Sequence, residues 1–190
     1  MPLILASTSP WRRALLERAG LSCSAAEPSV DERACRLEDP VELARELARQ
    51  KAASVARTRP DAVVLGADQV VHLEGRVFHK PASPEEHLDA LRALRGRTHE
   101  LVTGVALLHD DDERVFHETT RLRFRADLSD AELAAYVATG EGAGCAGGYE
   151  IEARGAWLCE SIEGSWFNVV GLPVLRVITE LRELGWRLDA

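Results

Sequence analysis

The spacing of apolar residues changes repeatedly along the chain between the pattern of strands and that of helices. Short apolar runs bounded by turn residues indicate strands, and stretches with apolar residues three and four apart indicate helices. Most of these helices begin with a capping residue, and Gly75 indicates a hairpin turn. The expected strands cover residues 3–6, 21–26, 62–71, 101–108, 115–125, 149–152 and 156–162, and the expected helices cover 10–19, 40–57, 84–95 and 130–139, with a last one restarting at 171–173. Strands and helices are thus interspersed, which predicts a mixed α/β fold.

Three further segments carry specific expectations. The acidic run at 110–113 lacks the alternating oxygen ligands of a calcium loop, so we expect a solvated hairpin loop there. Five of the nine residues from 140 to 148 are glycine, without the order of a P-loop, and we interpret this segment as a flexible binding or closure loop. In the last helix we expect Leu175, Ile178 and Leu181 to form the buried side.

Length and charge limit the function classes. A chain of 190 residues fits one domain or a tightly joined pair of lobes, and we expect a single domain over residues 1–190. The net charge of −8 argues against a general nucleic-acid surface, so a polyanionic ligand needs a local basic pocket. No apolar run approaches the roughly 18 residues of a membrane-spanning helix, and the N-terminal run is too short for a secretory signal.

The cysteines and histidines do not form a metal-binding pattern. The four cysteines have no C-x-x-C pair and no histidine at zinc spacing, so we expect reduced thiols in a cytoplasmic protein. The histidines, including His72, His79 and His87, are scattered, and we expect them to be solvated or in the core.

Candidate chemistry begins in the first turn of the first helix. Ser9 is a suitable N-cap, Pro10 suits the first helical position, and Arg12 and Arg13 follow directly. Cations are unfavourable at a helix N-terminus, so two arginines there are explained if an anion binds at that turn. The alternative is that both side chains extend into solvent.

A second candidate is the polar interruption of the buried strand at 62–71. Asp68 and Gln69 lie inside an otherwise apolar run, where an unpaired carboxylate costs several kcal/mol. Asp68 is therefore expected to be paired, metal-bound or at a strand end in a cleft, unless a bulge exposes it to water. Lys51 lies late in the helix at 40–57, where a favourable interaction with the helix dipole is a sufficient explanation.

Six short motifs in order resemble the Maf family of nucleoside triphosphate pyrophosphatases. They are Ser-x-Ser-Pro-x-Arg-Arg at 7–13, Val-Asp-Glu at 30–32, the helical Lys51, Gly-Ala-Asp at 66–68, His-Lys-Pro at 79–81 and Asn-Val-Val-Gly-Leu-Pro at 168–173. Each motif alone is weak, but six in order are specific, and the resemblance covers residues 3 to about 175. The resemblance implies an α/β fold with a mixed central sheet flanked by helices and two lobes around a cleft, as in the Maf and ITPase-like proteins. Such proteins are commonly dimeric, so a homodimer is expected.

The activity that the resemblance implies is hydrolysis of a nucleoside triphosphate to monophosphate and pyrophosphate with a divalent cation, Mg²⁺ or Mn²⁺. Asp68 matches the proton acceptor of the family, and an oxygen-only site of Glu32 and Asp68 suits the metal. The matching phosphate-binding positions are Ser7, Ser9, Arg12, Arg13, Lys51 and Lys80.

Three positions bear on which base is recognised. The dTTP/UTP-hydrolysing members carry Arg, Thr and Gln where this chain has Trp11, Gln69 and Glu152, a set that resembles the 7-methyl-GTP subgroup. The positive ring of 7-methylguanine favours an indole face, and its adjacent N1–H and amine donors match an acceptor-only carboxylate. Alternatively, Trp11 is a packed aromatic residue and Glu152 a solvated strand residue.

Two other functions remain open at this point. One is a dTTP/UTP pyrophosphatase, and the other is a nucleotide-binding regulator of septum formation without essential catalysis, a role from which the family takes an older name. An intact set of Asp68, Glu32, Lys51 and Lys80 argues against a protein that only binds, because binding alone needs no proton acceptor.

Overall fold

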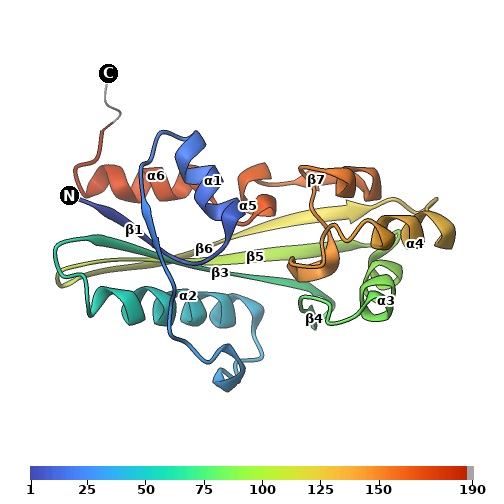
Figure 1. The fold of residues 1–190 in the computed structure, drawn as a ribbon, viewed down its shortest axis with the longest axis horizontal. Helices are drawn as coiled ribbons and strands as arrows, with labels where there is room; N and C mark the ends of the chain where they lie inside the picture. Colours follow the sequence, from blue (N-terminus) through green and yellow to red (C-terminus); the bar gives the residue numbers. More distant parts are fainter. Residues whose placement is uncertain (188–190) are drawn as a thin grey trace. The chain divides into compact units, whose positions relative to one another are not determined.

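The structure is a computed structural model that describes residues 1–187, apart from the side chain of Arg33. The strands form one sheet in the order β2-β1-β3-β5-β6-β7, and β4 pairs with β3 (Figure 1). The strands are β1 (Leu3–Ala6), β2 (Ser24–Ala26), β3 (Val63–Leu73), β4 (Arg76–Phe78), β5 (Thr98–His109), β6 (Asp112–Phe124) and β7 (Cys159–Glu163). β1 runs parallel to β2 and β3, whereas the pairs β3–β4 and β6–β7 are antiparallel, so the sheet is mixed.

Helices flank this sheet. They are α1 (Pro10–Arg18), α2 (Pro40–Ala56), α3 (Pro84–Leu94), α4 (Asp130–Ala138), α5 (Trp166–Val170) and α6 (Val174–Glu183), with short 3₁₀ turns η1 (Glu32–Ala34), η2 (Ala146–Gly148) and η3 (Arg154–Leu158). The predicted mixed α/β fold with a central sheet flanked by helices is confirmed.

The chain forms two compact units, which we call unit 1 and unit 2. Within the described residues, unit 1 comprises 1–68, 103–118 and 171–187, and unit 2 comprises 69–102 and 119–170. The predicted organisation in two lobes agrees with these units, whereas the cleft stays a prediction.

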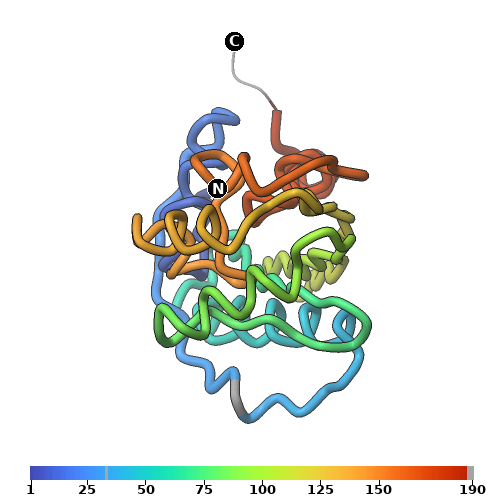
Figure 2. Tube along the Cα trace, turned by 90° about the vertical axis from the view of Figure 1, so that its right-hand side faces the viewer, coloured from blue at the N-terminus to red at the C-terminus, as the bar shows by residue number. Residues whose placement is uncertain are grey.

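In unit 1, α2 packs unusually close to its strands. It covers one face of the strands, and α1 and α6 lie on the other (Figures 1 and 2). A Cβ atom added to Gly66 of β3 would lie 2.3 Å from the backbone oxygen of Ala48, and one added to Gly104 of β5 would lie 2.2 Å from that of Ala44. Real Cβ contacts are longer than this, so both glycines are required for the helix to approach the sheet. Alanines at 44, 48 and 52 supply the matching small-residue face of α2.

Unit 2 has its own aromatic-rich core. Phe124, Tyr136 and Tyr149 are buried with aliphatic residues of α3, α4, β5 and β6. α4 begins with a capping box in which Ser129 and Glu132 bond each other's backbone N–H groups. In the segment that follows α4, Ala146 packs against this core, and Gly147 and Gly148 are buried.

The last third of the chain departs from the sequence prediction. The strand expected at 149–152 is wrong, because these residues turn back on themselves, with the Ala153 N–H bonded to the Glu150 carbonyl at 3.2 Å. The strand expected at 156–162 is partly wrong, since η3 occupies its start and β7 begins only at Cys159. The reason is a close backbone approach: a Cβ on Gly155 would lie 2.3 Å from the Glu150 oxygen.

The buried side of the last helix is also different. Val174, Val177 and Leu181 are buried, whereas Leu175 is 64% exposed and Ile178 is half-buried. A spacing of three and then four residues keeps side chains on one helix face, while two successive spacings of three rotate them by about 120°. The predicted buried side is therefore confirmed for Leu181 and wrong for Leu175.

The remaining fold expectations agree in most details. α1 ends before Gly20, which has a φ of +77°, and Gly75 turns the β3–β4 hairpin. The acidic hairpin turn is shorter than expected, since β6 already begins at Asp112. Within residues 1–187 no helix has the length and apolar character needed to cross a membrane. All four cysteines are free thiols, and a cytoplasmic location stays a prediction.

Candidate functional site

Unit 1 brings two predicted carboxylates onto one lysine. The Nζ of Lys51 lies 2.6 Å from Oδ1 of Asp68 and 2.6 Å from Oε1 of Glu32. Lys51 is 7% exposed and Asp68 is 8% exposed, so their contact is a buried ion pair. Asp68 is the member in the sheet, and Glu32 reaches the lysine from η1.

Local sequence and close packing together produce this arrangement. β3 runs without interruption through Asp68, so the alternative in which a bulge exposes Asp68 to water is wrong. The alternative of Lys51 as a cation at the helix C-terminus is also wrong, because its ammonium group lies against the sheet. Gly66, two residues before Asp68, allows α2 to come near enough for the lysine to reach it.

The turn between β1 and α1 is built around Arg12. Its Nε donates to the carbonyl of Gly171 at 2.9 Å, and its Nη1 donates to the carbonyl of Ala67 at 2.8 Å. Nη1 also lies 3.4 Å from Oγ of the buried Ser7, and that oxygen accepts the Ser9 N–H at 3.1 Å. Arg12 therefore joins the start of α1 to the residue before Asp68.

Burial and charge act on Arg12 in opposite directions. Burial lowers the pKa of its guanidinium group, and the nearby carboxylates of Asp68 and Glu32 partly offset this effect. An arginine nonetheless stays protonated in a protein, so the guanidinium group of Arg12 places a permanent positive charge at this turn.

The other residues of this turn are placed differently. Ser9 is the N-cap of α1, with its Oγ accepting the Arg12 N–H at 3.4 Å. Arg13 is exposed and paired with Glu17 at 2.7 Å, which raises its pKa, and Trp11 is half-buried in the first turn. An anion at this helix start would therefore meet the backbone N–H groups, Ser7 and Arg12, whereas Arg13 is directed to its partner Glu17.

Gln69, Lys80 and Glu152 belong to unit 2. The side-chain amide of Gln69 donates to the backbone carbonyl of Asn168 at 2.6 Å. Asn168 is fully buried, and its own amide donates to the Leu101 carbonyl at 3.1 Å. Lys80 and Glu152 are exposed, Lys80 after β4 and Glu152 in the turn after Tyr149.

Sequence reasoning missed two kinds of residue that shape these sites. Gly66 and Gly104 set the distance between α2 and the sheet. In the sequence, this close packing is indicated by glycines within two strands together with a row of alanines along one helix. His87 and His99 are buried and hydrogen-bonded, as expected for core histidines, but their partners could not be named from the sequence.

Comparison with known proteins now decides the family. A family model described as Maf-like protein matches residues 2–184. This chain belongs to the Maf family.

Its relatives within the family share nearly their whole length with it. It is 46% identical to a Symbiobacterium thermophilum protein over 97% of this chain and 94% of the relative, and 43% identical to one from Pelotomaculum thermopropionicum over 98% of both. A third, from Halalkalibacterium halodurans, is 41% identical over 97% of both. All three are named dTTP/UTP pyrophosphatase, so these relatives agree with the predicted family but do not support the 7-methyl-GTP subgroup expected from Trp11, Gln69 and Glu152. The solved structure of the Staphylococcus aureus Ham1 protein is a weaker match, with a TM-score of 0.48 and 14% identity over 66% of this chain and 73% of that one.

Proposed function

We propose that this chain hydrolyses a nucleoside triphosphate to the monophosphate and pyrophosphate, and that residues 1–190 act as one nucleotide pyrophosphatase domain. The observation that carries the proposal is the buried Asp68–Lys51 pair in a member of the Maf family. The shared name of the relatives, which cover almost the whole chain, supports the same reaction class.

In this proposal Asp68 is the general base. Its carboxylate orients the attacking water and accepts its proton while oxygen attacks phosphorus and the pyrophosphate leaves. The ammonium group of Lys51 is 2.6 Å away and balances the carboxylate's charge before substrate binds. Once phosphate oxygens arrive, the same ammonium group can donate to them, since it carries three N–H donors.

The phosphates are proposed to bind at the start of α1. The free N–H groups of a helix N-terminus and its dipole favour an anion, and Ser7, Ser9 and Arg12 surround this one. Arg13 takes part by exchanging its exposed partner Glu17, which costs little because surface ion pairs are weak. Lys80, exposed in unit 2, is the remaining proposed phosphate ligand.

A divalent cation fits the donor chemistry of Glu32 and Asp68. Both supply carboxylate oxygens, the ligands that Mg²⁺ and Mn²⁺ prefer, and both already converge on one positive group. Among the described residues no group of three or more histidine, cysteine or acidic side chains could hold a metal, so phosphate oxygens and water would complete the coordination. When bound, such an ion polarises the phosphoryl oxygens and stabilises the charge that develops on them.

We propose UTP and dTTP as the main substrates, with uracil and thymine as the recognised bases, and 7-methyl-GTP as the second candidate. The names of the relatives support the first. The second is supported by Trp11 and by the exposed Glu152, because an indole favours a cationic ring and a carboxylate accepts from adjacent donors. Apart from the divalent cation, a nucleotide substrate is the only ligand proposed, and a homodimer stays a prediction.

The proposal is tested with a substrate panel. Purified protein with Mg²⁺ or Mn²⁺ is given UTP, dTTP, 7-methyl-GTP and GTP, and pyrophosphate release is measured as kcat/KM for each. We expect release from UTP and dTTP, and a kcat/KM for 7-methyl-GTP above both would instead select the second candidate. Binding of nucleotides without any pyrophosphate release would favour the regulator over the enzyme.

A further inference from the structure

Three side chains from three different elements hold residues 148–150, the segment that leads into Glu152. The Nε2 of His87 in α3 lies 2.5 Å from the Gly148 carbonyl. The Nε2 of His99 in β5 lies 2.8 Å from the Tyr149 hydroxyl, and the Tyr136 hydroxyl in α4 accepts the Glu150 N–H at 3.1 Å. We call residues 148–150 the anchored segment, because each of its residues has a partner of its own.

The contact between His87 and Gly148 allows little movement. A carbonyl oxygen only accepts, so Nε2 of His87 must carry the proton and donate it. Gly148 has a φ of +78°, and a Cβ added there would lie 2.7 Å from Cδ2 of His87. The ring is thus held against the backbone by a hydrogen bond and by close packing, and the position suits only glycine.

The contact between His99 and Tyr149 is buried and neutral. His99 is 0% exposed, and burial lowers its pKa to about 4, with a smaller contribution from His72. Burial also raises the pKa of Tyr149 well above its usual value. Its ring meets those of His99 and Phe124 edge to face at 5.6 and 5.0 Å between centroids, which fixes the ring as well as the hydroxyl.

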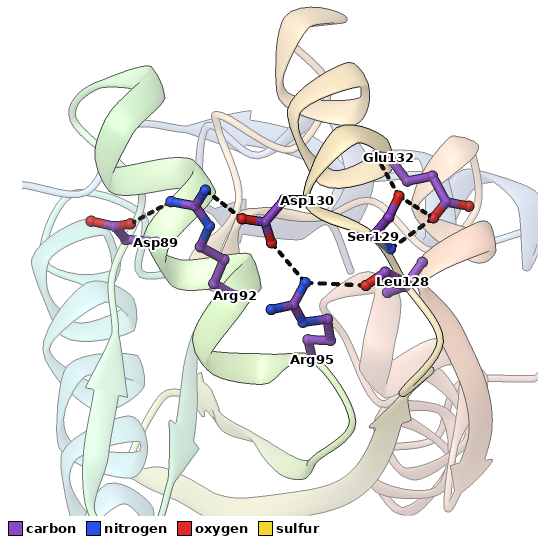
Figure 3. Close-up of polar contacts among 7 residues, drawn as sticks. All are labelled: Asp89, Arg92, Arg95, Leu128, Ser129, Asp130 and Glu132. Carbon is purple, nitrogen blue, oxygen red and sulfur yellow. Dashed lines mark hydrogen bonds and ion pairs between the residues drawn. The ribbon is translucent and has the colours of Figure 1, made fainter.

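The two helices that carry His87 and Tyr136 are themselves joined. Asp130, at the start of α4, accepts from Arg92 of α3 and from Arg95, the residue that follows α3, both at 2.8 Å (Figure 3). Arg95 also donates to the Leu128 carbonyl. The rings of His87 and Tyr136 meet edge to face at 6.0 Å. α3 and α4 therefore support the anchored segment as one body.

Beyond the anchored segment the chain stays fixed up to the turn that bears Glu152. Ile151 is buried in the core of unit 2. The Ala153 N–H closes the turn on the Glu150 carbonyl, and the Gly155 N–H donates to Oε1 of Glu141 at 2.9 Å. Glu152 is thus an exposed side chain on a backbone that is fixed on both sides.

We propose that His87 and His99 are positioning residues for base selection, acting through the anchored segment on Glu152. The inference rests on the proposed function and on the contact between Glu152 and the base that its second candidate includes. Selection between bases depends on the placement of a few hydrogen-bonding groups, because a displaced acceptor no longer meets the donors of the preferred base. Two buried contacts that fix the backbone before Glu152 therefore affect which base is accepted, without touching the nucleotide.

The test compares two variants that break the contacts with one that keeps the donor. Tyr149→Phe removes the hydroxyl that His99 contacts, and His87→Leu removes the donor to Gly148. We expect each to change the ratio of kcat/KM for 7-methyl-GTP to that for UTP by about 5-fold or more, mainly through KM, because a base contact is made in both ground and transition states. His87→Gln places an amide N–H at a similar reach, and we expect it to stay within about 2-fold of the unchanged protein.

Leu91→Val is the matched control. It alters the same core one turn further along α3, and we expect a lower Tm with an unchanged substrate ratio. The proposal is overturned if Leu91→Val moves the ratio as much as His87→Leu does, or if Tyr149→Phe and His87→Leu both keep the original ratio. A ratio that changes in Glu152→Gln but in neither anchor variant overturns only the positioning role. Absence of pyrophosphate release from the unchanged protein with every nucleotide overturns the proposed function as well.

Discussion

The two units hold their candidate residues by opposite means. In unit 1, Asp68 is fixed by a buried charge pair with Lys51, supported by Glu32. In unit 2, the backbone before Glu152 is fixed by hydrogen bonds of His87, His99 and Tyr136, and the His99 contact is neutral in the folded protein near pH 7.

This difference follows from what each region is proposed to do. A base that accepts a proton next to a triphosphate has to be charged, so it needs a counter-charge while the substrate is absent. A segment that selects a base needs an accurate position, which neutral groups give without a further charge near the ligand. Disruption of unit 1 should therefore affect turnover, and disruption of the anchored segment should affect substrate choice.

The largest expected effect comes from removal of the counter-charge. Lys51→Met leaves Asp68 buried without its cation, and we expect unfolding free energy to fall by about 4 kcal/mol together with loss of turnover. The double variant Lys51→Met with Asp68→Asn should recover much of the stability but none of the activity, measured by urea unfolding and by pyrophosphate release. Equal stability of the single and double variants would show that the pair does not matter for folding.

A methyl group at the helix–sheet contact should have the next largest effect. Gly66→Ala places a Cβ against the α2 backbone at Ala48, so we expect a loss of about 3 kcal/mol and a lower kcat as Lys51 moves from Asp68. Gly75→Ala is the control, since its φ is also positive at +83° but nothing lies within 4 Å. For Gly75→Ala we expect the free energy of unfolding to fall by only about 1 kcal/mol. An equal decrease in both variants would refute the explanation by close approach of α2.

The neutral contact in unit 2 predicts a specific pH dependence of stability. The pKa of His99 is about 4 when folded, against an ordinary value of 6.5. The unfolded chain therefore binds a proton that the folded protein does not, and stability falls as pH decreases from 6.5 to 4, by about 3 kcal/mol from this residue. His99→Gln should lack this part of the decrease when unfolding free energy is measured across that range. Parallel curves for both proteins would contradict it.

The smallest expected effect is at the surface link between α3 and α4. Asp130→Asn weakens the exposed ion pairs with Arg92 and Arg95, and we expect only a slight decrease in Tm, which salt reduces further in the unchanged protein. Thermal unfolding at low and high ionic strength provides the measurement. A large loss of stability would mean that this link, rather than the core contacts of His87 and Tyr136, holds the helices together.

The sequence allowed Asp68 to be found because a carboxylate inside an apolar strand is costly and must be paired. It did not identify Lys51 as the partner without the family resemblance, because that pairing depends on the approach of α2 to strands that are distant along the chain. The turn at 149–153 was mistaken for a strand, since its cause is the contact of Gly155 with the Glu150 backbone. Local patterns predicted the capped helices α1 to α4 and the last helix α6, but they missed the short α5. Close approaches between backbones distant along the chain could not be predicted from such patterns.

Product analysis by ³¹P NMR tests most directly whether Asp68 is the general base for pyrophosphate release. The unchanged protein and Asp68→Asn are each given UTP and Mg²⁺. Asp89→Asn, an exposed carboxylate of α3, is the control. We expect equal amounts of UMP and pyrophosphate from the unchanged protein and the control, and a turnover at least about 100-fold lower in Asp68→Asn. Formation of UDP and phosphate, or full turnover in Asp68→Asn, would contradict this expectation.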